Sequence, residues 1–293
     1  MKQSTFHVRR ITLSAVFLSI SLVLQTVFSF HIPLFGQNGM SIGISGIFSM
    51  MPAILFGPVY GAVTSGLSDL LGYILKPTGP YLPLMTLIVA VGGFLRGLIW
   101  KLLRNTDGKK TRMSVAVFSA LMLVIGISNS VFLSMDGVNR DFYAKMPIDQ
   151  IDTDGMHLIS KMLITRTIGT KDPSANLEMY LIFMTAGVLG SAILGLILII
   201  VDLIFSKKLS QEAKKGQIMP LLITLLISGL IVTTLNTILM QETLFESWKV
   251  LPFSVIWLPR AIEEIFGNSI KAYFIAILLG VFGRQKGLKD LIQ

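Results

Sequence analysis

The 293-residue sequence contains no cysteine and only three histidines, and charged residues make up just 14% of it. Without cysteine, the chain can form no disulfide, no thiolate metal site and no cysteine nucleophile. Soluble domains carry about 25% charged residues, so the shortage of charge argues against a soluble protein. What remains is hydrophobic, with 53% apolar residues and a mean hydropathy of +0.73. The composition predicts an all-α integral membrane protein.

The motifs of several enzyme classes are also missing. The sequence has no Walker A loop, no HExxH motif and no G-x-S-x-G motif, which argues against ATP hydrolysis, metalloprotease and serine-hydrolase chemistry in this chain. We therefore expect no enzyme activity, no metal site and no cofactor here. A net charge of +9 is compatible with nucleic-acid binding, but basic residues that fix membrane topology explain it better.

Eight hydrophobic segments are near the roughly 17–25 residues that a helix needs to cross a bilayer. They are residues 11–30, 40–56, 57–75, 84–104, 113–135, 177–205, 218–240 and 259–283. Most Lys and Arg residues fall at the ends that share a side with the N-terminus, so we expect both termini in the cytoplasm. The sequence predicts a polytopic helix bundle, a single membrane domain over 1–293.

The outer loop 136–176 carries charges of both signs. It can be a solvated connector or a lid over a binding site. Met156, Ile159, Met162 and Leu163 recur at helical spacing, which is compatible with a helix that lies flat on the membrane surface.

A lone carboxylate interrupts the apolar segment 57–75. Gly61, Ser65, Asp69 and Tyr73 recur every four residues and so form one polar stripe of mostly small residues. A charge at the bilayer centre costs about 2.5–3.5 kcal/mol on insertion scales and usually has a function. We predict that Asp69 accepts hydrogen bonds from N–H donors of a ligand and that Tyr73 stacks on a ring. The alternative is that Asp69 only orients helices.

A rigid loop with three prolines, residues 76–83, follows this segment and brings Thr78 and Tyr81 to the same outer end. We predict that both contact the ligand. Gln25 and Asn236 also lie towards the outer ends of their segments and can line a cavity there. Arg96 is expected to extend to the cytoplasmic surface.

The last segment carries a second polar stripe. Arg260 and Glu264 are four residues apart and can pair, and Glu263 adds another carboxylate. We predict that Arg260 binds an anionic group of the ligand, although an anchor at the membrane interface is equally compatible with its position. Lys271 lies deep in the segment and should pair with Glu264 or Asp69.

The motif GPVYGAVTSGLSDLLGYILKPTGPYLP at 57–83 resembles the signature of substrate-binding S components of energy-coupling factor (ECF) vitamin transporters, particularly the folate-type group. LLISGLIVTTLNTILM at 225–240 and LPRAIEEI at 258–265 are similar to the same group. The resemblance covers 8–104 and 218–283, and it implies a six-helix core. Residues 105–217 would then be an inserted helical hairpin.

The resemblance implies a subunit in the prokaryotic plasma membrane that binds a vitamin-like ligand and docks on a transmembrane coupling protein with two cytoplasmic ATPases, which use the ATP. Ala15 and Ser19 correspond to the family's small-residue docking face. Where folate-type members have an arginine and a lysine, this chain has Gln25 and Glu263. A less acidic or zwitterionic ligand therefore fits better than a dicarboxylate.

Two other functions remain open on the residues alone. A self-sufficient secondary transporter could use Asp69, Glu264 and Lys271 as an ion relay. An intramembrane enzyme could use Glu263 and Glu264 as acid and base. However, adjacent helical residues diverge by about 100°, which disfavours the enzyme.

Overall fold

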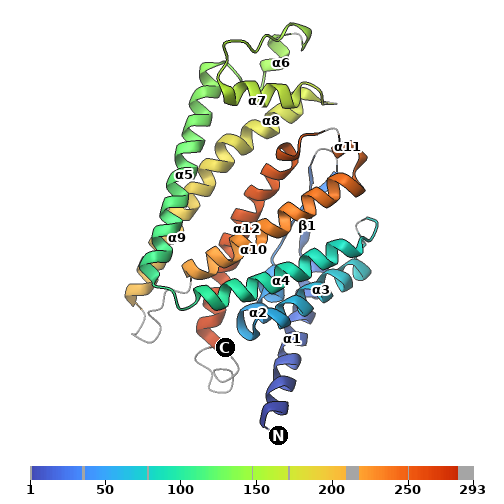
Figure 1. Ribbon diagram of the computed structural model, residues 1–293, viewed down its shortest axis with the longest axis vertical. Helices are drawn as coiled ribbons and strands as arrows, with labels where there is room; N and C mark the ends of the chain where they lie inside the picture. The colour runs from blue at the N-terminus through green and yellow to red at the C-terminus, as the bar shows by residue number, and fades with distance from the viewer. Residues whose placement is uncertain are drawn as a thin grey trace.

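The computed structural model describes residues 2–34, 37–77, 79–146, 148–170, 172–208, 218–249 and 251–282. Helices dominate the described chain, and a single antiparallel hairpin adds the two strands (Figure 1). In chain order the elements are α1 Lys2–Val27, β1 Ser29–Leu34, β2 Gln37–Gly43, α2 Gly46–Phe56, α3 Pro58–Leu75, α4 Pro83–Leu103, α5 Gly108–Met135, α6 Phe142–Lys145, η1 Ile148–Gln150, α7 Leu158–Thr167, α8 Pro173–Ile182, η2 Phe183–Gly187, α9 Val188–Lys208, α10 Ile218–Leu239, η3 Met240–Leu244, α11 Glu246–Lys249 and α12 Phe253–Phe282.

Six helical segments of the described chain are long and apolar enough to cross a membrane. They are His7–Val27, Pro83–Leu103, Gly108–Met135, Pro173–Ile204, Ile218–Leu244 and Phe253–Phe282. The predicted span 40–56 is wrong, because its first residues belong to β2 and α2 has only 11 residues. At 1.5 Å per residue, α2 is about 16 Å long, roughly half the hydrocarbon thickness. Residues 57–75 do form a helix, α3, but it is not among the six. Eight spans are therefore not confirmed.

Glycines let α2, α3 and α4 pack at close range. A Cβ on Gly61 of α3 would lie 2.5 Å from the carbonyl oxygen of Gly93 in α4 and 2.6 Å from Cβ of Ala53 in α2. A Cβ on Gly97 would lie 2.6 Å from the backbone nitrogen of Pro58. The small residues that the sequence places on one face of α3 thus face α4, as small residues commonly do between membrane helices.

The main apolar core joins the first and last parts of the chain. Phe17 of α1, Met51 of α2, Leu222 of α10 and Ile275 of α12 are all buried in it. α10 packs against both α4 and α12. Helices from residues 2–103 and 218–282 therefore form one bundle, and α5 and α9 run side by side along its flank (Figure 1).

Polar contacts fix the α5–α9 hairpin. Arg112 Nε donates to a carboxylate oxygen of Asp202 at 2.6 Å, and the side chain of Asp202 is only 2% exposed. Nearer the other end of α5, Asn129 Nδ2 donates to the carbonyl oxygen of Met184 at 2.9 Å, within the π-helical turn η2. That this hairpin is an insertion remains a prediction.

The described residues between α5 and α8 form a cap at the end of the hairpin, and they share an apolar cluster with the adjoining ends of α5 and α8 and with Val255 of α12 (Figure 1). Leu163 and Ile164 of α7 are buried in this cluster, so the expectation that Leu163 lies on the membrane surface is wrong. Asp136 accepts from the backbone N–H of His157 at 2.9 Å. Burial alone raises the pKa of Asp136, but the neighbouring hydroxyl of Ser160 and the hydrogen bonds from His157 outweigh burial and hold the pKa below its ordinary value.

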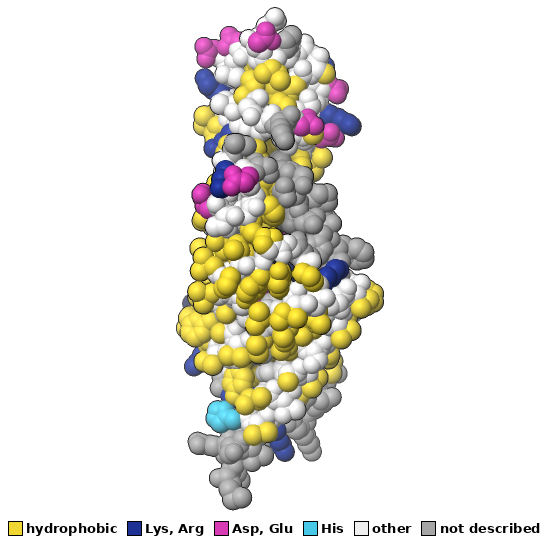
Figure 2. All heavy atoms as spheres, turned by 90° about the vertical axis from the view of Figure 1, so that its right-hand side faces the viewer, with side chains coloured by type: hydrophobic (Ala, Val, Ile, Leu, Met, Phe, Trp, Pro, Cys, Tyr) yellow, Lys and Arg dark blue, Asp and Glu magenta, His cyan; other side chains and the backbone are white. Residues whose placement is uncertain are grey.

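The surface agrees with a membrane location. Figure 2 shows hydrophobic side chains over much of the lower and middle part of one face, while acidic and basic side chains gather at its upper end. The exposed apolar side chains of α1, α5 and α9 include Val23, Leu121 and Ile197. Large exposed apolar areas of this kind suit contact with lipid.

Candidate binding cavity

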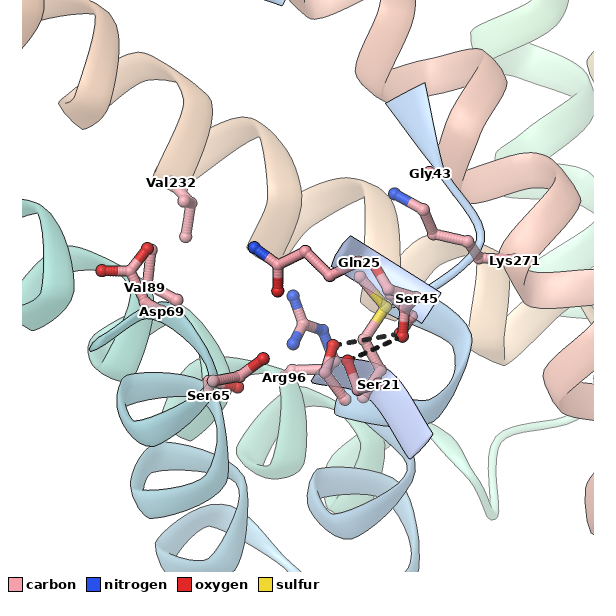
Figure 3. Close-up of a pocket in the computed structure, with 14 residues that line it drawn as sticks. Ser21, Gln25, Gly43, Ser45, Ser65, Asp69, Val89, Arg96, Val232 and Lys271 are labelled. Carbon is pink, nitrogen blue, oxygen red and sulfur yellow. Dashed lines mark hydrogen bonds between the residues drawn. The ribbon is translucent and has the colours of Figure 1, made fainter. Parts of the chain in front are cut away.

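A cavity of about 240 Å³ lies among α1, α2, α3, α4, α10, α12 and the segment that ends β2 (Figure 3). The short helix α2 and the close approach of α3 to α4 place these elements around it. Its lining is mainly polar, with three charged residues and five serines. The lining residues are Ser21, Gln25, Gly43, Ser45, Gly46, Ser49, Met50, Ser65, Ser68, Asp69, Val89, Arg96, Val232 and Lys271.

Asp69 lies at this cavity, as the ligand hypothesis requires. One of its carboxylate oxygens accepts a hydrogen bond from Thr86 Oγ1 of α4 at 2.6 Å. Tyr81 OH lies 3.0 Å from the same Thr86 oxygen, and the rings of Tyr81 and Tyr73 are 5.0 Å apart. Thr86 therefore connects Asp69 to the tyrosine pair, although neither tyrosine is part of the lining.

Gln25 also lines the cavity and rests directly on α3. A Cβ on Gly72 would lie 2.7 Å from Gln25 Nε2, so the amide occupies the space that a side chain at Gly72 would fill. Ser21, one turn before Gln25 on α1, donates to the carbonyl oxygen of Ser45 at 3.1 Å. The cavity wall thus offers hydroxyl, amide and carboxylate groups to a ligand.

Arg96 is placed differently from the prediction. Instead of extending to the cytoplasmic surface, it lines the cavity and is only 7% exposed (Figure 3). Lys271 of α12 lines the cavity as well and interacts electrostatically with Glu263, while the described residues contain no salt bridge between Lys271 and the expected Glu264 or Asp69.

The other predicted residues on α10 and α12 do not line the cavity. Arg260 Nη1 contacts Met240 Sδ at 2.9 Å, and the described residues contain no ion pair between Arg260 and Glu264. Glu264 instead accepts a hydrogen bond from Asn268 Nδ2 at 2.8 Å. Asn236 is partly buried in α10, and its side-chain oxygen has no hydrogen-bond partner within the described part of the chain.

Thr78 lies outside the described residues, so its predicted contact stays a prediction. Ala15 and Ser19 are exposed on α1, and Ser19 Oγ donates to the carbonyl oxygen of Ala15 at 2.9 Å. The sequence analysis named Ser65 in the polar stripe of residues 57–75, but it did not identify Thr86 or the other serines of the lining. Their side chains are common in membrane helices, and no sequence pattern links Thr86 to Asp69.

Residues 5–170 match the family model described as ECF-type riboflavin transporter, S component. This match supports the predicted ECF S component, whereas the folate-type group is not confirmed. The matched family is a transporter family rather than an enzyme family. No curated protein and no solved structure matches the chain. The match runs from α1 through α7, so α10 and α12 lie outside it, although both pack into the same bundle as α1–α4.

Proposed function

The chain belongs to the family of ECF-type riboflavin transporter S components, and on this basis we propose that it captures a flavin-class vitamin in the cavity beside Asp69. The family name supplies the ligand class. The cavity supplies the physical support, because a heterocycle with N–H and carbonyl groups and a hydroxylated side chain can use carboxylate, amide and serine partners together. The observation that carries the proposal is the buried carboxylate of Asp69 at the wall of a polar cavity.

A flavin fits this lining better than folate does. Folate is the larger molecule, because a benzoate ring and a glutamate extend its heterocycle. The cavity volume of about 240 Å³ is also at the small end for a ligand site, since typical pockets measure about 300–1,000 Å³. A compact ligand, or one whose ring edge alone enters the cavity, is favoured.

We further propose that the chain works with a transmembrane coupling protein and two cytoplasmic ATPases, in a prokaryotic plasma membrane with both termini cytoplasmic. Ala15 and Ser19 support a docking face on α1. Both are small and exposed, and the hydroxyl of Ser19 is already bonded to its own helix. A partner helix can therefore approach closely without leaving that hydroxyl unpaired.

Flavin binding is directly measurable, because a protein site quenches the fluorescence of the flavin. The purified chain in mild detergent is titrated with riboflavin, and any molecule that co-purifies is identified by mass spectrometry. Asp69→Ala should weaken binding by roughly tenfold or more, because hydrogen bonds to charged groups contribute about 1.5–3 kcal/mol. Asp154→Asn is the matched control, since the side chain of Asp154 is exposed in the cap, far from the cavity lining, and pairs with Lys161.

Two results would contradict the proposal. One is a wild-type chain that binds no flavin although it is folded. The other is an Asp69→Ala variant that binds riboflavin as tightly as the Asp154→Asn control does.

A further inference from the structure

Arg96 is a buried cation that the proposed function has not yet used. It projects from α4, its side chain lines the cavity, and only 7% of its surface is exposed. Its Nε has no hydrogen-bond partner among the described residues. An unpaired donor of this kind is costly when it is buried, because it has lost its water without gaining an acceptor. An acceptor from a ligand would remove that cost.

The groups around Arg96 leave an excess of positive charge on the cavity wall. Arg96 and Lys271 line the cavity, and among the described residues Asp69 is the only carboxylate that does. Glu264 interacts electrostatically with Arg96, and Glu263 with Lys271, but neither glutamate reaches the lining. One carboxylate oxygen of Glu264 is also committed to Asn268. The ligand therefore meets two cations and one anion.

The close-up shows how these charges are distributed. In Figure 3 the guanidinium of Arg96 points into the cavity between Ser65 on one side and Ser21 on the other, while Asp69 lies apart, towards Val89. The wall is thus divided into an acceptor end at Asp69 and a donor region at Arg96. A ligand that spans both must present donors to the first and an acceptor to the second.

We infer that Arg96, with Lys271, forms an anion-accepting subsite, so that the cavity prefers a flavin-class ligand that carries an anionic oxygen group over a neutral one. The inference rests on the proposed function, since it assumes that this cavity holds the flavin. Charge-assisted hydrogen bonds from a guanidinium to an oxyanion are shorter and stronger than those to a neutral oxygen. The low dielectric constant of a buried site strengthens them further.

A matched pair of flavins tests the charge preference. Lumiflavin has a neutral methyl group on the ring nitrogen where carboxymethylflavin has a carboxylate-bearing arm, and otherwise the two are the same. The wild-type chain should bind carboxymethylflavin at least about tenfold more tightly than lumiflavin. In Arg96→Gln this ratio should fall to near one, whereas in Arg140→Gln it should stay unchanged. Arg140 is a suitable control because it lies exposed in the cap, where it pairs with Glu178 of α8.

Riboflavin is titrated in parallel to distinguish a failure of the proposed function from a failure of the inference about Arg96. If the folded wild-type chain binds neither riboflavin nor either probe, the proposed function fails. If it binds riboflavin but shows no preference for carboxymethylflavin, or if Arg96→Gln keeps the preference, only the inference about Arg96 is overturned. Should Arg96→Gln not fold, Lys271→Gln provides the same measurement at a less buried position, and a ratio equal to that of the wild type would again overturn the inference.

Discussion

The contact of Gly61 with two neighbouring helices gives the sharpest test of the fold. A methyl group at this position would lie 2.5 Å from the carbonyl oxygen of Gly93, 2.6 Å from Cβ of Ala53 and 2.9 Å from Cα of Ala53. These atoms belong to backbone or to a one-carbon side chain, so none can move away by rotating. In Gly61→Ala, α3 must therefore separate from both α2 and α4 by roughly 1 Å.

Such overpacking typically costs about 1–3 kcal/mol. Helix propensity acts in the opposite direction, since alanine is favoured over glycine by about 1 kcal/mol within a helix. A net loss of stability therefore requires the steric contact. Because Ser65 and Asp69 follow Gly61 along α3 and line the cavity, the displacement should also weaken ligand binding.

Gly280→Ala in α12 is the matched control, because its added methyl group would meet nothing within 4 Å. Thermal unfolding in detergent, followed by intrinsic fluorescence, compares the two variants, and flavin titration measures binding. Gly61→Ala should unfold at a lower temperature than the wild type, and Gly280→Ala at the same temperature or slightly higher. Equal melting temperatures for the two variants would refute the close packing of α3 against α2 and α4.

Three further predictions concern single polar contacts. Thr86→Val removes the hydrogen bond to Asp69 and should weaken flavin binding by roughly tenfold while leaving the melting temperature nearly unchanged, so a binding curve equal to the wild type would contradict it. Asp202→Asn breaks a buried ion pair with Arg112 and should destabilise the hairpin by about 3 kcal/mol, as measured by thermal unfolding; no shift would show that the pair is not needed. Because the pKa of Asp136 is lowered in the folded protein, its ionised form stabilises the folded cap at pH values above its ordinary pKa of 3.8. This stabilisation is lost as the pH falls below 3.8 towards the pKa of the folded state. Hydrogen exchange in α7 should therefore accelerate as the pH falls from about 5 to 3 relative to the intrinsic rates, and Asp136→Asn should flatten this dependence.

Asp69 and Gln25 could be predicted from the sequence because each is unusual for its surroundings. A carboxylate in an apolar helix needs a partner or a function whatever the fold, and both residues do line the cavity. Arg96 was misplaced for the opposite reason. Its position near Lys101 and Arg104 made the membrane surface available to it, and hydropathy does not say which face of α4 meets the bundle.

The β1–β2 hairpin was not predicted, because the apolar character of residues 40–56 suggests a helix, whereas the spacing of the apolar residues at the start of this segment indicates a strand. In residues 40–45 large apolar residues alternate with serine or glycine, with Met40, Ile42 and Ile44 at every second position. Alternation of this kind is typical of a strand, whereas residues 46–56 follow with the continuous apolar character of a helix. Treating the two as one segment gave a helix long enough to span, and with it the count of eight.

Pairings across helices could not be predicted from the sequence, yet they share one physical feature. Gln25 rests on Gly72, the side chain of Lys271 lies 3.2 Å from the Cβ position of Gly46, and Glu264 occupies the space beside Gly229. In each case a polar side chain in or next to the cavity fills the volume that a glycine on a neighbouring element leaves open. The glycines near the cavity therefore have two uses. Gly61, Gly93 and Gly97 bring backbones together, whereas those beside polar side chains make room for groups that an apolar helix surface would otherwise exclude.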